Sequence, residues 1–245
     1  MTRAKRRAFQ EGNKRMIGFY DYTVILTYFS LLSATTGIVV SLSGGGHPYY
    51  GCLFLLFCGL CDAFDGKVAR TKKGRTKMEK DFGIQIDSLS DLVAFGVLPA
   101  CIGAALIRVS PYLTNMLEGL PVRWETASWK FVLHAFLVLY VLAAMIRLAY
   151  YNVTEEERQE KESGVRKEYL GLPVTSAALI FPLVLLVQYM SKTDLTLVYL
   201  LVSLVTAVLF ISPVRIPKPG MRGILIMVGI GAVEFFLLLL RKVLL

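Results

Sequence analysis

Four aspartates in two short stretches are the residues of this chain whose spacing could do chemistry. Asp62 and Asp65 stand three residues apart, and Gly83, Asp87 and Asp91 recur at steps of four. Side chains three or four residues apart share one face of a helix. Two helices lying side by side would therefore aim four carboxylates at one point.

A cluster of this kind predicts a site for divalent metal. Each stretch adjoins an apolar run, and a carboxylate near hydrocarbon is costly and rarely present without a function. Oxygen donors, with no cysteine or histidine expected nearby, select a hard cation, Mg²⁺ or Mn²⁺. Two such ions can clamp a diphosphate and stabilise a displacement at phosphorus. The alternative is a set of interfacial salt bridges, which two pairs at one depth with glycines at matching offsets disfavour.

Small and basic residues accompany the aspartates. Gly66, Ala69 and Gly83 have side chains small enough for a ligand or a neighbouring helix to approach the backbone. Arg70 could neutralise a phosphate or hold a metal-binding carboxylate. The segment 71–77 is rich in Lys and Arg, which predicts a positive field for an anionic substrate.

The elements that must position these residues are membrane spans. A helix needs about 20 apolar residues to cross the hydrocarbon core, and 55% of the 245 residues are hydrophobic. This pattern predicts an all-α, multi-pass helical bundle, with the basic segment 1–22 as an interfacial helix. The expected spans are 23–42, 48–66, 86–107, 130–150, 171–190, 194–212 and 223–240.

The distribution of Lys and Arg predicts the orientation of the bundle. With the N-terminus in the cytoplasm, 21 basic residues fall in cytoplasmic segments and six on the opposite side. Such an excess is typical of the cytoplasmic face of the cell membrane, so the aspartates should also lie at that face. The net charge of +9 could suggest nucleic acid as a partner, but clustering between apolar runs argues against it.

The stretch from Asp62 to Asp91 resembles the signature of the CDP-alcohol phosphatidyltransferases, which build phospholipid head groups in membranes. The pattern is Asp-x-x-Asp-Gly-x-x-Ala-Arg followed by Gly-x-x-x-Asp-x-x-x-Asp. Segments 87–100, 147–152 and 171–173 resemble the branch of this family that uses serine. The resemblance implies six core transmembrane helices, in a catalytic domain 23–212, and an additional C-terminal helix within 213–245.

The resemblance also implies a reaction. A phosphatidyl group would pass from CDP-diacylglycerol to the hydroxyl of L-serine, giving phosphatidylserine and CMP. Asp62, Asp65 and Asp87 would ligate two metal ions. Asp91 would complete the metal site and act as the base on the attacking hydroxyl. Membrane lipids are further expected partners, and a homodimer would fit the family. The residues expected to contact the CDP moiety are Thr27, Gly66, Ala69, Arg70 and Gly83.

The chain departs from the family pattern at two places. Twelve residues separate Arg70 from Gly83, more than the family usually has, and their polar character predicts a loop extension. Relatives tend to show Leu-Thr-x-x-Asn in the first span, where this chain has Ser30 in place of the asparagine. The resemblance therefore does not extend to the asparagine of the first span.

The acceptor is the least determined part of the site. Arg147 could receive the carboxylate of serine or simply anchor the cytoplasmic end of the fourth span; Asn152 and Lys167 are further candidates for the same pocket. Inositol phosphate or glycerol phosphate are alternative acceptors. A cation transporter is a third interpretation, disfavoured because the acidic residues cluster at one interface. Glu234 is the one deep acidic residue that no interpretation explains.

Overall fold

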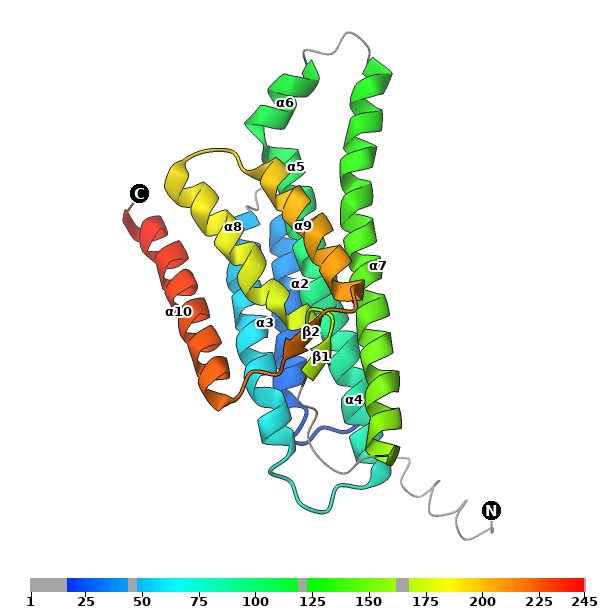
Figure 1. Ribbon diagram of the computed structural model, residues 1–245. Helices are drawn as coiled ribbons and strands as arrows, with labels where there is room; N and C mark the ends of the chain where they lie inside the picture. The colour runs from blue at the N-terminus through cyan, green and yellow to red at the C-terminus, as the bar shows by residue number, and fades with distance from the viewer. Residues whose placement is uncertain (1–16, 44–47, 119–122, 162–167, 245) are drawn as a thin grey trace.

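The structure, a computed structural model, describes residues 17–43, 48–118, 123–161 and 168–244. Long helices packed side by side form a bundle (Figure 1), which confirms the prediction of an all-α membrane fold. The helices are α2 (Ile25–Leu42), α3 (Pro48–Ala69), α4 (Lys77–Asp91), α5 (Leu98–Val109), α6 (Pro111–Glu118), α7 (Arg123–Lys161), α8 (Ala177–Ser191), α9 (Thr196–Ile211) and α10 (Met221–Leu244).

Five helical segments are long and apolar enough to cross a membrane, so the chain is a multi-pass membrane protein. They correspond to the first, third, fourth, fifth and seventh predicted spans. The other two predicted spans also form helices: α3, which carries two of the aspartates, and α9, an apolar helix of 16 residues. The five segments are Ile25–Leu42, Lys77–Val109, Trp129–Arg158, Val174–Ser191 and Met221–Leu240.

Of the interfacial helix predicted over 1–22, the structure describes only residues 17–22, and for these residues the prediction is wrong. Residues 17–24 form turns and bends, and Ile17 is 98% exposed. Gly18 has a φ of 122°, which a right-handed helix cannot contain. The Asp21 carboxylate accepts the backbone N–H of Thr23 at 2.9 Å, a local turn that competes with helix formation.

The predicted loop extension between Arg70 and Gly83 is only half a loop. Helix α4 begins at Lys77, because the Thr76 hydroxyl accepts the backbone N–H of Glu79 at 3.2 Å and the Glu79 carboxylate accepts that of Thr76 at 2.7 Å. This reciprocal pair is a capping box. The extra residues therefore lengthen α4 as well as the loop before it.

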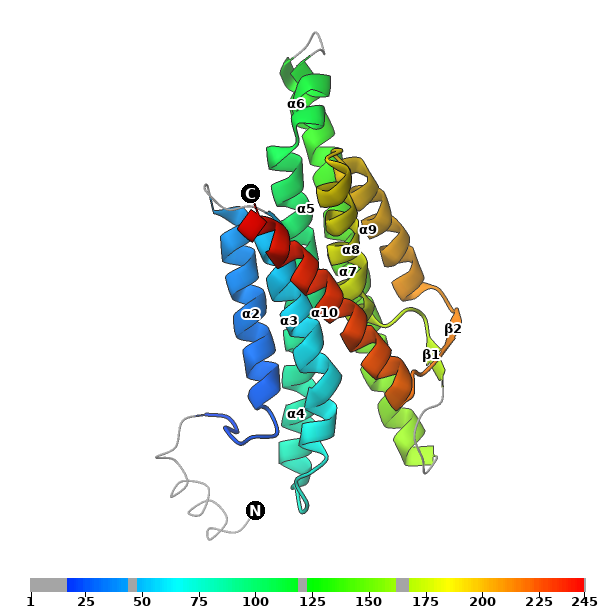
Figure 2. The ribbon, with the colours of Figure 1, turned by 90° about the vertical axis from the view of Figure 1, so that its left-hand side faces the viewer.

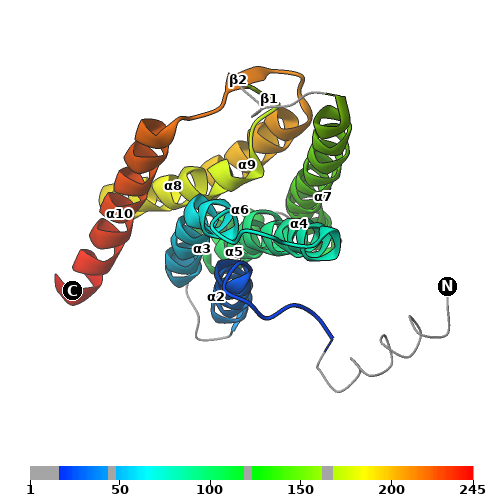
Figure 3. The same cartoon turned by 90° about the horizontal axis from the view of Figure 1, so that it is seen from below.

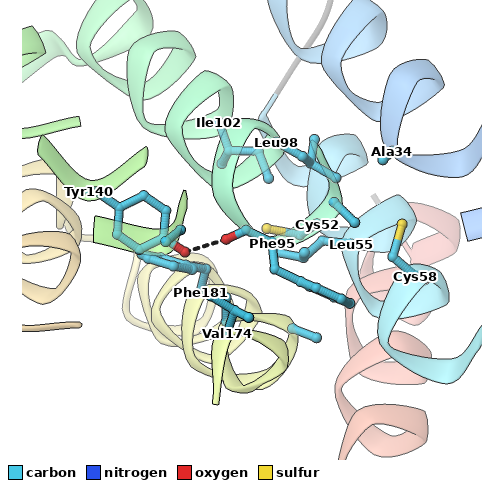
Figure 4. Packing of buried hydrophobic residues seen from close by; sticks show 14 of the residues in the cluster. Ala34, Cys52, Leu55, Cys58, Phe95, Leu98, Ile102, Tyr140, Val174 and Phe181 are labelled. Carbon is cyan, nitrogen blue, oxygen red and sulfur yellow. Dashed lines mark hydrogen bonds between the residues drawn. The ribbon is translucent and has the colours of Figure 1, made fainter. Parts of the chain in front are cut away.

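A π-helical segment, η1 (Leu92–Val97), joins α4 to α5 immediately after Asp91. Pro99 has no backbone N–H, so the carbonyl of Phe95 lacks its usual helical donor. The hydroxyl of Tyr140 on α7 donates to that carbonyl instead (Figure 4). Tyr199 on α9 donates in the same way to the carbonyl of Pro99, at 2.7 Å. Two buried tyrosines thus fasten the irregular part of the helix to its neighbours.

The hydrophobic core lies where these tyrosines meet α3, α5 and α8 (Figure 4). The ring centroids of Tyr140 and Phe181 are 5.3 Å apart, in an edge-on arrangement. Helix α3 approaches its neighbours through small residues: a Cβ on Gly59 would lie 2.6 Å from the Cβ of Ala178 on α8. Such close approach is how membrane helices gain packing energy, and it fixes the helix that carries Asp62 and Asp65.

Two short strands, β1 (Glu168–Leu170) and β2 (Arg215–Pro217), form an antiparallel pair. Strand β1 precedes α8, and strand β2 follows α9. No strand was expected from the sequence. After β1 the chain turns at Gly171, whose φ is 82° and whose Cβ, if present, would lie 2.8 Å from the carbonyl oxygen of Phe210. Only glycine suits both conditions. The end of β1 is thereby held against the end of α9.

Helix α10 lies at the periphery and crosses α3 and α8 obliquely (Figures 2 and 3). It confirms the predicted C-terminal helix. Glu234 points into the contact rather than toward lipid: it is 3% exposed, and among the described residues its Oε2 has no hydrogen-bond partner. A cavity of about 450 Å³, lined mainly by aliphatic side chains of α8 and α10, adjoins it.

Candidate active site

The four predicted aspartates come together at the end of α3 and along α4. These parts of the two helices lie at one end of the bundle, the lower end in Figure 1. The carboxyl groups of Asp65 and Asp87 are within hydrogen-bonding reach of each other. Asp62 and Asp91 lie close enough to the same pair for their charges to interact. Asp91 is the most buried of the four, with 9% of its surface exposed.

Basic partners for this cluster are missing from the part of the chain that the structure describes. The three ion pairs in the described part of the chain join other residues: Lys72 with Asp21, Lys72 with Glu79, and Arg158 with Glu155. The salt-bridge alternative is thus unsupported by the described contacts. Crowded carboxylates repel one another and lose hydration, so they are unfavourable without a compensating cation.

The donor chemistry of the cluster fits a hard divalent cation. Among the described residues, however, no three Asp, Glu, His or Cys side chains are already arranged as a chelating group. The assignment of the four aspartates as metal ligands stays a prediction. The expectation that no cysteine lies nearby is wrong, because the Cys61 thiol is near enough to Asp62 and Asp65 to interact with their charges.

Two arginines lie over the two glycines of the motif. The Arg70 guanidinium rests on Gly66, where a Cβ would be 3.5 Å from Nη1. The Arg75 guanidinium rests on Gly83, where a Cβ would be 2.7 Å from Nη2. Arg70 was expected near the site. Arg75 was expected only as part of the basic loop, and its spacing gave no sign that the loop folds back onto α4. Ala69, the last residue of α3, is half-buried beside Arg70.

Helix α2 supports α4 from behind. Thr27 is buried, and its carbonyl accepts the hydroxyl of Ser90, the neighbour of Asp91, at 3.2 Å. Ser30, one turn further along, has a buried hydroxyl with no partner in the described part of the chain, while its carbonyl contacts the Cys58 sulfur at 3.3 Å. Thr27 therefore lies next to the carboxylate cluster, and its predicted contact with the nucleotide stays a prediction.

The three candidate acceptor residues have different outcomes. Asn152 of α7 donates from Nδ2 to the hydroxyl of Ser88 at 2.7 Å, which places it beside Asp87. Arg147 is 5% exposed and donates from Nε to the carbonyl of Leu172 at 3.2 Å. Part of its guanidinium thus supports the turn after β1. Lys167 lies outside the described residues.

A membrane bundle with a cluster of carboxylates at one end defines a multi-pass membrane protein with an acidic site. Comparison with known families is consistent with this class. The CDP-alcohol phosphatidyltransferase family matches residues 23–213, which include all four aspartates. The chain belongs to this family of phosphatidyltransferase enzymes.

Curated relatives have modest identity to the chain. A CDP-diacylglycerol–serine O-phosphatidyltransferase of Saccharomyces cerevisiae is 31% identical over 170 residues, 68% of this chain and 53% of the yeast protein. An archaetidylserine synthase of Methanothermobacter thermautotrophicus is 29% identical over 212 residues, 86% of this chain and 76% of the archaeal one. The chain thus spans about half the length of the yeast relative.

Proposed function

We propose that this protein transfers a phosphatidyl group from CDP-diacylglycerol to the hydroxyl of L-serine in phospholipid biosynthesis, giving phosphatidylserine and CMP. The observation that carries the proposal is the convergence of four carboxyl groups between α3 and α4, without a described basic partner, in a member of the CDP-alcohol phosphatidyltransferases. The names of the yeast and archaeal relatives support serine as the acceptor.

Members of this family are metal-dependent, and the donor set here suits Mg²⁺ or Mn²⁺. Asp62, Asp65 and Asp87 would hold two ions, with Asp91 completing the site. When bound, such ions supply positive charge for the diphosphate of the donor. The diphosphate would then lie between the aspartates of α3 and those of α4.

Asp91 is the proposed base. The oxygen of serine forms a bond to the phosphorus that bears diacylglycerol, and the bond from that phosphorus to the bridging oxygen breaks. CMP leaves with the electron pair, and the hydroxyl proton passes to the Asp91 carboxylate. General-base help typically contributes about a hundredfold to ten-thousandfold. Low exposure of Asp91 keeps this carboxylate away from bulk water.

The nucleotide end of the donor would lie over the small residues of the motif. Gly66 leaves room for it once Arg70 turns away, Ala69 adds little bulk, and Gly83 would contact it beside the Arg75 guanidinium that covers this glycine. Arg70 is exposed, so its side chain is free to turn from Gly66 toward a phosphate. Thr27 would complete the pocket from α2.

For the acceptor, we propose that Arg147 receives the carboxylate of serine and that Asn152 helps to position it. The contact of Asn152 with Ser88 supports its place beside Asp87. Lys167 is retained as a weaker candidate. A phosphorylated acceptor, inositol phosphate or glycerol phosphate, would need several clustered basic side chains beyond Arg147. Because the chain belongs to the CDP-alcohol phosphatidyltransferases, we do not propose a cation transporter.

The test is CMP release by the purified protein from CDP-diacylglycerol, with a panel of alcohols and with or without Mg²⁺ or Mn²⁺. We expect release that requires both metal and serine, and that Asp91→Asn abolishes. Release with glycerol phosphate or inositol phosphate but not serine would overturn the acceptor. Release that ignores metal would overturn the site. We also propose a homodimer, which would fit the family and which cross-linking in native membranes would test.

A further inference from the structure

The loop between α3 and α4 brings a second arginine to the carboxylate cluster. Arg75 folds back along α4, so that Nη2 donates to the Glu79 carbonyl at 3.1 Å and covers Gly83. Its Nε is sheltered from solvent and has no hydrogen-bond partner among the described residues. A buried N–H without an acceptor is unfavourable, which indicates that an acceptor is supplied from elsewhere.

The position of this guanidinium suits an anionic ligand of the cluster. Gly83 precedes Asp87 by one helical turn on the same face of α4, and Arg70 covers Gly66 on the facing helix α3. Each helix therefore presents one arginine beside its aspartates. A guanidinium binds phosphate through paired N–H groups in a fixed geometry, so one arginine at each glycine would suit the two phosphates of a diphosphate held by the cluster.

Lys72 holds the loop in this position. Its Nζ lies 2.6 Å from the Asp21 carboxylate and 2.8 Å from that of Glu79. The loop is thus joined to the segment before α2 on one side and to the capping box of α4 on the other. Lys73, by contrast, is exposed and takes part in no contact that the structure describes.

We propose that Arg75 is a second phosphate-binding arginine for the CDP-linked lipid, and that Lys72 is the positioning residue that holds it over Gly83. The inference rests on the proposed function, because it assigns a new contact to the same donor. It gives the longer spacing between Arg70 and Gly83 a purpose: the added residues deliver a cation that the family motif does not contain.

The experiment measures binding of CDP-diacylglycerol in detergent micelles with Mg²⁺ and without acceptor, together with the KM for each substrate. Arg75→Ala should weaken binding and raise the donor KM by about 10-fold to 100-fold, the usual range for one hydrogen bond to a charged group. The serine KM should stay unchanged, and Arg75→Lys should recover only part of the loss. Lys73→Ala is the matched control: it removes one charge from the same loop but no described contact, so the donor KM should rise only slightly, through weaker long-range attraction.

A double mutant tests the positioning role. If Lys72 acts through Arg75, Lys72→Ala should raise the donor KM, and adding it to Arg75→Ala should change nothing further. Independent, additive effects would overturn that role. Donor binding by Arg75→Ala equal to that of Lys73→Ala would overturn the arginine contact, provided that both variants melt as wild type does. Arg75→Lys gives the same comparison if the alanine variant fails to fold.

The outcomes separate this inference from the proposed function. A wild-type protein that binds CDP-diacylglycerol but releases CMP with an alcohol other than serine removes the serine proposal and leaves the Arg75 comparison valid. A wild-type protein that does not bind CDP-diacylglycerol removes both.

Discussion

Asp65 of α3 and Asp87 of α4 approach within hydrogen-bonding reach, and the charges of Asp62 and Asp91 act on the same small volume. In a folded protein without bound cation, this arrangement is electrostatically unfavourable. A residue that is retained for metal binding should therefore affect activity and stability in opposite directions. That difference separates a metal ligand from a residue with a purely structural role.

Replacing Asp87 with Asn should expose this opposition. We expect activity to fall by about a thousandfold, since the interactions of a catalytic metal are worth several kcal/mol. The melting temperature in the absence of metal should stay the same or rise, because one repelling charge is removed. Mg²⁺ should raise the melting temperature of the wild type, and this increase should be absent in the variant. Asp81→Asn, an exposed site on the same helix, is the control and should behave as wild type; a similar loss there would contradict the assignment.

The contact between Asp21 and Lys72 should be insensitive to pH over a wide range. The hydrogen bond with Lys72 lowers the pKa of Asp21 from 3.8 to about 2, so its contribution is present above 3.8 and is lost as the pH falls toward 2. The same hydrogen bond raises the pKa of Lys72 above 10.5, so that contribution is lost only as the pH rises through this higher value.

We therefore expect a constant ratio of donor KM values for wild type and Lys72→Met from about pH 5 to about pH 9. The measurement is the pH profile of both proteins. A ratio that changes within this window would show that a different titrating group controls the loop.

At this scale the sequence predicts the aspartates well, because a period of three or four on a helix is a local property. It does not predict Arg75. The approach of Arg75 to Gly83 depends on how the loop before α4 folds in space, and the local sequence pattern does not determine that fold. Asn152 lies between these cases: it was expected near the acceptor pocket, but its partner Ser88 was not predicted.

At the scale of elements, the irregular stretch after Asp91 is the part of the fold with the clearest link to the site. The π-helical turns of η1 and the missing N–H of Pro99 leave a backbone carbonyl that Tyr140 satisfies from another helix. The position of the proposed base thus depends on a side chain that is fully buried in the hydrophobic core.

Tyr140→Phe keeps the ring and removes only this hydroxyl. We expect a loss of about 1–3 kcal/mol in the free energy of unfolding, because a buried carbonyl loses its donor. Denaturant unfolding in detergent measures it. Tyr112→Phe, at a tyrosine that is 54% exposed, should change the stability little. Equal stability of the two variants would contradict the role given to Tyr140.

Gly59→Ala should separate α3 from α8. The added methyl would lie 2.6 Å from the Cβ of Ala178, closer than carbon atoms approach, so one helix must shift. Overpacking of this kind costs about 1–3 kcal/mol. Gly229→Ala on α10 meets nothing within 4 Å and serves as the matched control, neutral or slightly stabilising. Thermal inactivation half-lives in detergent compare the two; a Gly59 variant as stable as the control would mean that the contact is loose.

The existence of the helices was predictable, because an apolar run of membrane length has few alternatives. Their ends were not. Helix α4 starts six residues before Gly83 because of a capping box, and the sequence does contain its Thr-x-x-Glu pattern. The pair β1 and β2 joins segments more than forty residues apart, a pairing that local patterns do not specify.

At the scale of the whole molecule, the remaining proposal concerns its orientation. The loop before α4 and the loop between α8 and α9 lie at opposite ends of the bundle (Figure 1). The excess of Lys and Arg predicts that the first faces the cytoplasm. We also propose that 1–22, 23–212 and 213–245 act as an N-terminal segment, a catalytic unit and an added helix.

Single cysteines test the orientation. Lys73→Cys and Thr193→Cys place a thiol in each of the two exposed loops. In intact cells a membrane-impermeant maleimide should label the Thr193 variant alone, and both should be labelled once the membrane is permeabilised. The wild type, in which three of the four cysteines are buried, gives the background. Labelling of the Lys73 variant in intact cells would reverse the topology.

The β-ladder that pairs Leu170 with Arg215 holds the chain that enters α8 beside the chain that leaves α9. A peptide tag inserted between Ser191 and Thr196 would lengthen only the connection between α8 and α9 at the opposite end of these helices, and both helices would keep their places. The same tag inserted after Gly171 would separate the start of α8 from the end of α9. The turn that Arg147 supports would then be the first feature lost.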